Sequence, residues 1–365
     1  MLVSKLQNLG ALIAGKTNMN EMGYGTSGRN YYHNDMPNHK HSDYSAIEGG
    51  AALVSNESVD VAIGTDTLGV SRIAAASNQI VCYKPTINRY PNDYGFKMSQ
   101  SMSTVTLQTR SMEDLIFIDD VIQGKNNEKV MNLSEIKLGI IQDYMQEDLD
   151  PVVNQKFNSF IKTLELNGVN FIRNDGICNL LTLLRASGTI LQYEYFRGLQ
   201  DYIDKNSLDK TIEQLIDKSQ TAQTRHYLFK LKDNRMSELR YKQALFIQRA
   251  ELIEKMQEYF MRNNLDAIIY PTMVCKPFKL KGIQEEFGYK INHNERQVSQ
   301  LGISLRNTRL SSLANMPSIS IPIKSGIQDI DFEKNVNFEL ASLTWNDRKL
   351  LRIGQALEKD INTTQ

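Results

Sequence analysis

The sequence predicts an α/β fold, in which helices flank a central mixed β-sheet within a single domain. Two observations lead to this prediction. Short apolar segments with strand-like patterns alternate with amphipathic helical segments in both terminal parts of the chain. Between those parts, residues 178–264 have an almost continuous helical pattern with charges on the outer faces. We therefore expect one domain over residues 1–365, with 178–264 as a helical insert or lid.

The N-terminal part contains five expected elements in order. They are a helix, a short buried strand, a polar loop, a helix of small residues and a strand, at 2–9, 11–14, 25–45, 48–56 and 59–64. Gly15 ends the short strand, and Gly49 and Gly50 suit a helix that packs close to its neighbours. In the last strand, period-two alternation places Val59, Val61 and Ile63 on one face.

The remaining elements follow from capping residues and apolar runs. Ser111 with an acidic first turn begins a helix that Gly124 ends, and Asp150 with Pro151 begins another. Short apolar runs predict strands at 136–141, 169–172, 265–270, 319–323 and 336–340. A final amphipathic helix is expected over 347–359.

Charge and cysteine content exclude several classes of protein. The 42 Lys and Arg residues balance the 42 Asp and Glu residues, so no net field attracts nucleic acid or an anionic membrane. No apolar run is long enough for a membrane span. Cys82, Cys178 and Cys275 lack metal-ligand spacing and suit a reducing compartment. We expect a cytoplasmic protein that binds neither nucleic acid nor membrane.

The most informative stretch runs from the strand at 59–64 into a tight turn and then to Arg72. Such a turn exposes successive backbone N–H groups, here those of Thr67, Leu68, Gly69 and Val70. Those groups could hold the oxyanion of a hydrolytic reaction or a bound carboxylate. Asp66 and Arg72 have the charges of a pair that braces the turn.

Six segments, taken in order, resemble the amidase signature family. They are GKTNMNE at 15–21, GGAA at 49–52, GTDTLGVSR at 64–72, YKPTINRYP at 83–91, RSMEDL at 110–115 and MPSISIP at 316–322. The Arg-Tyr-Pro piece and the Arg-Asn-Thr piece at 306–308 are most similar to the branch that hydrolyses arylacetamides such as indoleacetamide and mandelamide. The resemblance covers nearly the whole chain outside its divergent centre.

The resemblance implies hydrolysis of an amide C–N bond by a Ser–cis-Ser–Lys triad, with no metal or organic cofactor. Carried over residue by residue, the nucleophile falls on Val70 and the bridging serine on Ala46. The family's lysine belongs to a segment before the GKTN motif, and this sequence begins after that position. Leu68 also replaces a glycine of the family's turn. These departures predict an amidase homologue that is inactive or strongly impaired, yet able to bind a small amide or carboxylate.

Two alternatives follow from the same residues. Ser71 could be a shifted nucleophile, with Ser45 as relay and Lys16 as base, which would make the chain an active amide hydrolase. A third interpretation is a non-catalytic partner chain, with another protein covering the region that the missing N-terminal segment would occupy.

Two further polar sites have simpler interpretations. His33, His39 and His41 lie near Asp35 and Asp43, a donor set that could bind a divalent metal, but a solvated loop is the preferred interpretation and no metal is expected.

Glu48 could be a new acid or base. We prefer the interpretation that its charge suits the start of the helix that follows.

Overall fold

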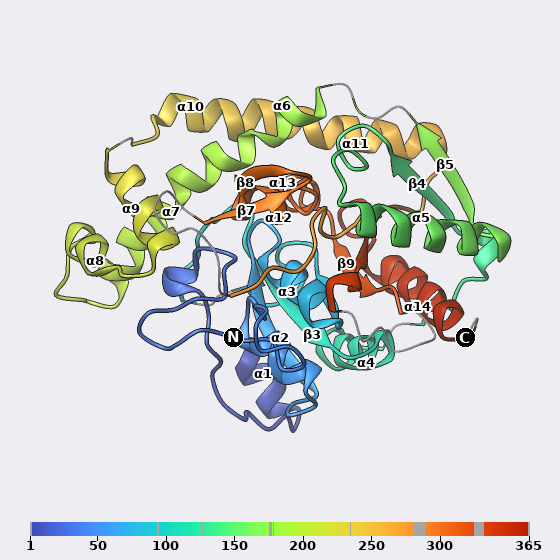
Figure 1. Ribbon diagram of the computed structural model, residues 1–365, viewed down its shortest axis with the longest axis horizontal. Coiled ribbons are helices and arrows are strands. Elements are labelled where there is room, and N and C mark those ends of the chain that lie inside the picture. The colour runs from blue at the N-terminus through green and yellow to red at the C-terminus, as the bar shows by residue number, and fades with distance from the viewer. Residues whose placement is uncertain are drawn as a thin grey trace.

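A central mixed sheet organises the computed structural model (Figure 1), which describes residues 2–92, 95–125, 127–174, 177, 179–233, 235–280, 289–324 and 332–363. Within these ranges the sheet has eight strands in the order β1-β3-β2-β9-β10-β6-β4-β5. The strands are β1 (Val61–Asp66), β2 (Val81–Lys84), β3 (Thr104–Thr109), β4 (Lys137–Ile141), β5 (Asn170–Asn174), β6 (Ala267–Pro271), β9 (Ser318–Pro322) and β10 (Asn337–Ala341). The expected α/β class with a mixed sheet is confirmed.

Antiparallel and parallel pairing divide this sheet. From β1 through β3, β2, β9 and β10 to β6, neighbouring strands are antiparallel, whereas β6, β4 and β5 run parallel to one another. A separate antiparallel hairpin is formed by β7 (Lys290–His293) and β8 (Arg296–Ser299). The strands at the centre of the sheet are buried over their whole length, as expected when helices cover both faces.

Helices cover the sheet and extend beyond it (Figure 1). Outside the central helical block they are α1 (Leu2–Asn8), α2 (Gly49–Ser55), α3 (Val70–Asn78), α4 (Met112–Gln123), α5 (Pro151–Leu166), α12 (Gln300–Ser304), α13 (Arg309–Leu313) and α14 (Asp347–Thr363). The Ser111 hydroxyl accepts a hydrogen bond from the amide of Asp114, and the Asp150 carboxylate accepts one from Val152, as the capping patterns predict.

The central block is helical throughout most of its length. It contains α6 (Leu180–Leu184), α7 (Ala186–Lys205), α8 (Ile212–Lys218), α9 (Ala222–Asp233), α10 (Glu238–Lys242), a π-helical turn at Gln243–Gln248, and α11 (Arg249–Asn263). In Figure 1, α10 and α11 run along the upper edge of the molecule, and α8 and α9 project at its left end. A role for this block as a lid stays a prediction.

Three details differ from the sequence-based prediction. Residues 11–14 form no strand, and Leu12 is 96% exposed, because no described strand pairs with this segment. In β1 it is Ala62 that is buried, facing Gly50 of α2, whereas Ile63 on the other face is exposed. Strands β2 and β3 were not predicted.

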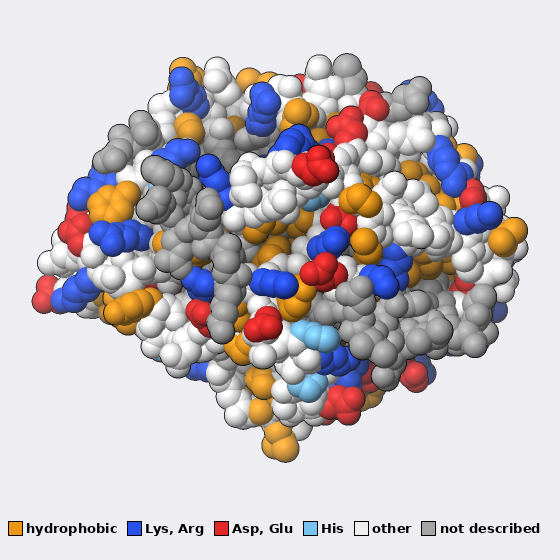
Figure 2. Space-filling view, in the orientation of Figure 1, with side chains coloured by type: hydrophobic (Ala, Val, Ile, Leu, Met, Phe, Trp, Pro, Cys, Tyr) orange, Lys and Arg blue, Asp and Glu red, His pale blue; other side chains and the backbone are white. Residues whose placement is uncertain are grey.

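Surface properties of the described residues agree with the balanced composition. Figure 2 shows Lys and Arg interspersed with Asp and Glu, and hydrophobic side chains visible between them near the centre of that face. No helix in the described ranges combines the length and apolar character needed to cross a bilayer. Cys82 and Cys275 are free and buried, and Cys178 lies outside the described residues.

Candidate functional site

The turn between β1 and α3 is held from two sides. The Thr67 hydroxyl is hydrogen-bonded to that of Ser103 at 2.7 Å, and the carbonyl of Leu68 accepts a hydrogen bond of 2.6 Å from Thr308. Gly69 has φ of +124°, and a Cβ there would lie 2.0 Å from the Thr308 hydroxyl. Only glycine meets both the conformational and the steric demand at this position.

Four successive backbone N–H groups of this turn, Thr67 to Val70, have no hydrogen-bond acceptor among the described residues. They precede or begin α3, where unpaired amides and the helix dipole together favour a negative charge. Chemically, the turn can therefore hold a carbonyl oxygen, an oxyanion or a carboxylate. That these four residues bind an oxyanion or a carboxylate stays a prediction.

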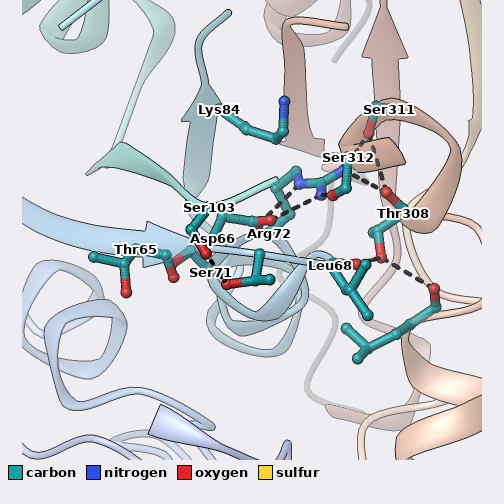
Figure 3. A network of polar contacts seen from close by, with 12 residues as sticks. Thr65, Asp66, Leu68, Ser71, Arg72, Lys84, Ser103, Thr308, Ser311 and Ser312 are labelled. Atoms are coloured by element: carbon teal, nitrogen blue, oxygen red, sulfur yellow. Dashed lines mark hydrogen bonds and ion pairs between the residues drawn. The ribbon is translucent and has the colours of Figure 1, made fainter. Parts of the chain in front are cut away.

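Arg72 crosslinks the turn to distant parts of the chain (Figure 3). Its Nε and Nη2 donate to the two carboxylate oxygens of Asp66 at 3.1 and 3.0 Å, and Nη1 donates to Glu339 at 2.5 Å. Three further acceptors complete its shell, namely the Ser311 and Ser312 hydroxyls at 2.6 and 2.7 Å and the Thr308 carbonyl at 3.2 Å.

All three charged side chains of this network are fully buried. Burial would lower the pKa of Arg72, but the charges of Asp66 and Glu339 outweigh it and raise that pKa above its ordinary value. The guanidinium thus stays charged. Asp66 and Arg72 brace the turn as a pair, and Glu339 on β10 extends this pair across the sheet.

On the other side of the first turn of α3, Ser71 contacts Glu48. The buried Ser71 hydroxyl lies 3.1 Å from the Glu48 carboxylate and 3.1 Å from the Thr65 carbonyl. Gln108 of β3 donates to the second Glu48 oxygen at 2.8 Å. Burial, reinforced by the charge of Asp66, raises the pKa of Glu48 to about 7, although hydrogen bonds from Gln108 and Ser71 oppose the shift.

The structure gives Glu48 contacts that the sequence did not predict, and its interaction with the helix dipole stays a prediction. Glu48 occupies the position before the first residue of α2, but its side chain makes no capping hydrogen bond. The carboxylate turns instead toward α3 and β3, because Ser71 and Gln108 offer donors there. Glu48 is therefore part of the support beneath the turn.

Lys84, at the end of β2, is a second fully buried cation. Its ammonium donates to the carbonyl of Met316 at 2.9 Å, and Figure 3 shows it apart from the Arg72 network. Burial, together with the charge of Arg72, lowers the pKa of Lys84 to about 7 despite the opposing charges of Asp66, Asp347 and Glu339.

The other predicted site residues are not brought into hydrogen-bond contact with Ser71. The Ser45 hydroxyl donates to the Ser27 carbonyl at 2.8 Å and accepts from the amide of Ile47 at 2.9 Å. Lys16 is exposed to solvent. Ala46 is buried and its carbonyl accepts from Asn78 at 2.9 Å, while the half-buried Val70 begins α3.

Several residues around the turn were not predicted to act together. Thr308 and Glu339 lie in motif segments of the sequence, but nothing in those segments indicates that both bind Arg72. Gln108 lies in a strand that the sequence pattern did not predict.

The polar N-terminal loop offers no assembled metal site. His33 and His39 are exposed. Over the part of the chain that the structure describes, no three His, Cys, Asp or Glu side chains gather closely enough to hold a metal ion.

Comparison with known proteins agrees with the motifs. The family model described as Amidase matches residues 1–351. Indoleacetamide hydrolase of Allorhizobium ampelinum is 28% identical over 375 residues, which cover 100% of this chain and 78% of that protein. Mandelamide hydrolase of Pseudomonas putida is also 28% identical, over 98% of this chain and 71% of the relative.

Solved structures share the fold. A crystal structure of an amidase superposes with a TM-score of 0.83 at 20% identity, covering 98% of this chain and 76% of that one. The native peptide amidase of Stenotrophomonas maltophilia gives a TM-score of 0.78 at 20% identity, over 99% of this chain and 76% of the other. With a family match over 351 of 365 residues and relatives of the predicted kind, this chain belongs to the amidase family.

Proposed function

We propose that this protein binds a small amide or carboxylate at the Thr67–Val70 turn and hydrolyses amides poorly or not at all. Two facts carry the proposal. The four backbone N–H groups of the turn have no acceptor among the described residues, and the position of the nucleophile at the start of α3 is occupied by Val70. The main-chain part of an oxyanion site needs no particular side chain. Valine has no heteroatom to attack a carbonyl, and the buried Ala46 offers no hydroxyl to relay a proton.

The test combines binding with turnover. We expect saturable binding of indoleacetamide or mandelamide in calorimetric titration, no ammonia release above the buffer rate, and no labelling by a fluorophosphonate serine probe. Binding without turnover supports the proposal, since loss of a nucleophile leaves only ground-state binding and oxyanion stabilisation. Steady ammonia release, or a complete absence of binding, would overturn it.

One observation favours the alternative in which Ser71 is the nucleophile. Its hydroxyl is 3.1 Å from Glu48, a carboxyl whose pKa of about 7 suits a general base. Against this assignment, the Ser71 side chain is fully buried and faces the Thr65 carbonyl. If Ser71 is active, the fluorophosphonate adduct maps to Ser71 by mass spectrometry and is lost in Ser71→Ala, whereas Ser45→Ala retains it unless Ser45 is the relay.

The partner interpretation also has one supporting observation. Leu9, Leu12 and Ile13 are exposed along one short segment, and contiguous exposed apolar residues are typical of contact surfaces. Sedimentation of the purified chain and of Leu12→Asp would test it. Two results together would argue against a covering partner. The wild-type chain would be a monomer, and proteases would cut this segment no faster than the rest of the chain.

A further inference from the structure

The loop that precedes β3 holds the turn through one serine. Ser103 ends this loop, which begins at Ser99, and the Ser103 hydroxyl shares a hydrogen bond of 2.7 Å with the Thr67 hydroxyl. The same oxygen accepts from the amide of Ser99 at 3.0 Å, and the amide of Ser103 donates to the Ser99 carbonyl at 3.0 Å. The position of Thr67 therefore depends on the conformation of the Ser99–Ser103 loop.

A buried carboxylate from the central helical block binds this loop. Glu194 of α7 is only 5% exposed. Its Oε2 accepts from the Ser99 hydroxyl, and it accepts from both the amide and the hydroxyl of Ser101 at 3.0 Å. Hydrogen bonds to a carboxylate are stronger than those between neutral groups. Removing the carboxylate would leave three donors of the loop without this acceptor in a buried place, so the loop would rearrange.

The second oxygen of Glu194 is held from within the helical block. The Tyr241 hydroxyl of α10 donates to Oε1 at 2.8 Å, and the Tyr241 ring stacks on that of Tyr193 of α7 with ring centres 4.0 Å apart. Arg249 of α11 makes another contact between the block and the loop, since it donates to the Ser101 carbonyl at 3.1 Å. Hydrogen bonds thus connect the helical block, the loop and the turn without interruption.

We propose that Glu194 is a positioning residue for the ligand site. It fixes the Ser99–Ser103 loop, and through Ser103 it keeps Thr67 and the backbone N–H groups of the Thr67–Val70 turn in the orientation that binds a ligand. Donors that are ordered before binding give higher affinity, because the ligand does not have to order them. The inference rests on the proposed function and adds that the helical block contributes to ligand affinity.

The test measures affinity and the state of the turn separately. Calorimetric titration gives the affinity for indoleacetamide, and NMR of the ligand-free protein reports on the turn. Isotope labelling of glycine nitrogen and leucine carbonyl carbon selects glycines that follow leucine, among them Gly69 of the turn and Gly139 of β4. Glu194→Ala should weaken binding roughly 5- to 30-fold, the size of one or two hydrogen bonds. It should also shift or broaden the Gly69 signal and leave the Gly139 signal unchanged.

A double-mutant cycle tests whether Glu194 acts through Ser103. Ser103→Ala alone should weaken binding, and adding Glu194→Ala to it should then weaken binding little further. Two losses that simply add would mean that Glu194 affects the site by another route, and would contradict the inference.

Two tyrosine variants form a matched control. Tyr241→Phe removes the hydroxyl that holds Glu194, and it should change affinity and the Gly69 signal in the same direction as Glu194→Ala but less. Tyr195→Phe removes a neighbouring hydroxyl, which donates to the Met22 carbonyl at 3.1 Å, and it should change neither. Glu194→Gln keeps an acceptor oxygen and should retain most of the affinity.

The outcomes separate this inference from the proposed function. Unchanged affinity and an unchanged Gly69 signal in Glu194→Ala, or equal effects of the two tyrosine variants, would overturn the inference alone. If the wild-type chain binds no indoleacetamide, the proposed function is wrong, and the Gly69 signal still decides whether Glu194 positions the turn. Thermal melting verifies folding. If Glu194→Ala does not fold, Ser99→Ala replaces it, since that variant removes a hydroxyl donor to Glu194.

Discussion

Arg72 and Lys84 are both cations with no exposed side-chain surface, and they lie near the same turn. Arg72 is surrounded by two carboxylates, two hydroxyls and a carbonyl. Among the described residues, Lys84 has one acceptor, the carbonyl of Met316. Burial penalises both charges, but only Arg72 has opposite charges in direct contact. The outcome differs accordingly, since the pKa of Arg72 rises and that of Lys84 falls to about 7.

The difference shows that the number and charge of partners, rather than burial, decide whether a buried cation is structural. Guanidinium offers five donors in a rigid plane, so it can join Asp66, Glu339 and Thr308 at once. An ammonium is a point charge on a flexible stem and releases its proton when desolvated. Arg72 therefore keeps its charge within a buried network at the turn, whereas Lys84 at the end of β2 has a lowered pKa and donates to the Met316 carbonyl.

The largest expected effect is that of Arg72→Met. Removing the guanidinium leaves the buried carboxylates of Asp66 and Glu339 without compensation, which should lower the free energy of unfolding by about 3–5 kcal/mol. Urea titration measures it. Arg110→Met is the matched control, since its ion pair with Asp60 is solvent-exposed and should contribute less than about 1 kcal/mol. Similar losses for the two variants would contradict the structural role of Arg72.

An intermediate effect is expected from Glu48, through pH. The folded-state pKa of Glu48 is about 7, above the ordinary value of 4.5. Between these two pH values the carboxyl is protonated in the folded state and ionised in the unfolded state. Its contribution to stability is therefore fully present below pH 4.5 and is lost as pH rises toward 7. We expect Glu48→Gln to gain about 1–2 kcal/mol relative to wild type between pH 5 and 8, allowing for partial exposure.

Thermal melting across that pH range measures the gain. Glu57→Gln is the control, because it removes an exposed carboxylate outside the site, and the gain of Glu48→Gln should exceed its effect. A pH-independent difference for Glu48→Gln would show that Glu48 is ionised throughout.

The smallest effect should come from Lys84→Met. The variant loses one hydrogen bond to Met316, worth about 1 kcal/mol, but no longer buries an ammonium. Because the folded pKa lies below the ordinary 10.5, the folded state binds fewer protons than the unfolded state above pH 7, and wild-type stability rises toward alkaline pH. The free energy of unfolding of Lys84→Met, taken relative to that of wild type, should thus be higher at pH 6 than at pH 9. A large loss at pH 6 would instead mean that Lys84, like Arg72, stabilises the fold as a cation.

Much of the architecture was predictable because its signals are local. Capping residues identified α4 and α5, and apolar runs identified β4, β6, β9 and β10. Strand β3 was missed because its alternating threonines suggest a half-exposed segment, yet every residue is buried between helices. The strand expected at 11–14 failed for the opposite reason, since its apolar residues find no partner strand among the described residues.

In the candidate site, too, contacts within one motif were predictable and contacts between distant segments were not. The turn and the Asp66–Arg72 pair lie six residues apart and follow from one motif. The interactions of Arg72 with Ser311, Ser312 and Glu339, and those of Glu48 with Ser71 and Gln108, join segments that are distant in sequence. No local pattern in a single sequence encodes which distant acceptor a buried donor will meet.

The contacts of Arg72 also bear on the order of folding during synthesis. Thr308 and Glu339 are 236 and 267 residues further along the chain, so they leave the ribosome long after the turn itself. Until then the guanidinium lacks most of its partners, and contacts of such high sequence separation form slowly because a long loop must first close. The nascent chain therefore exposes an incomplete core for most of its synthesis, and it depends on its C-terminal third to lock the part that was made first.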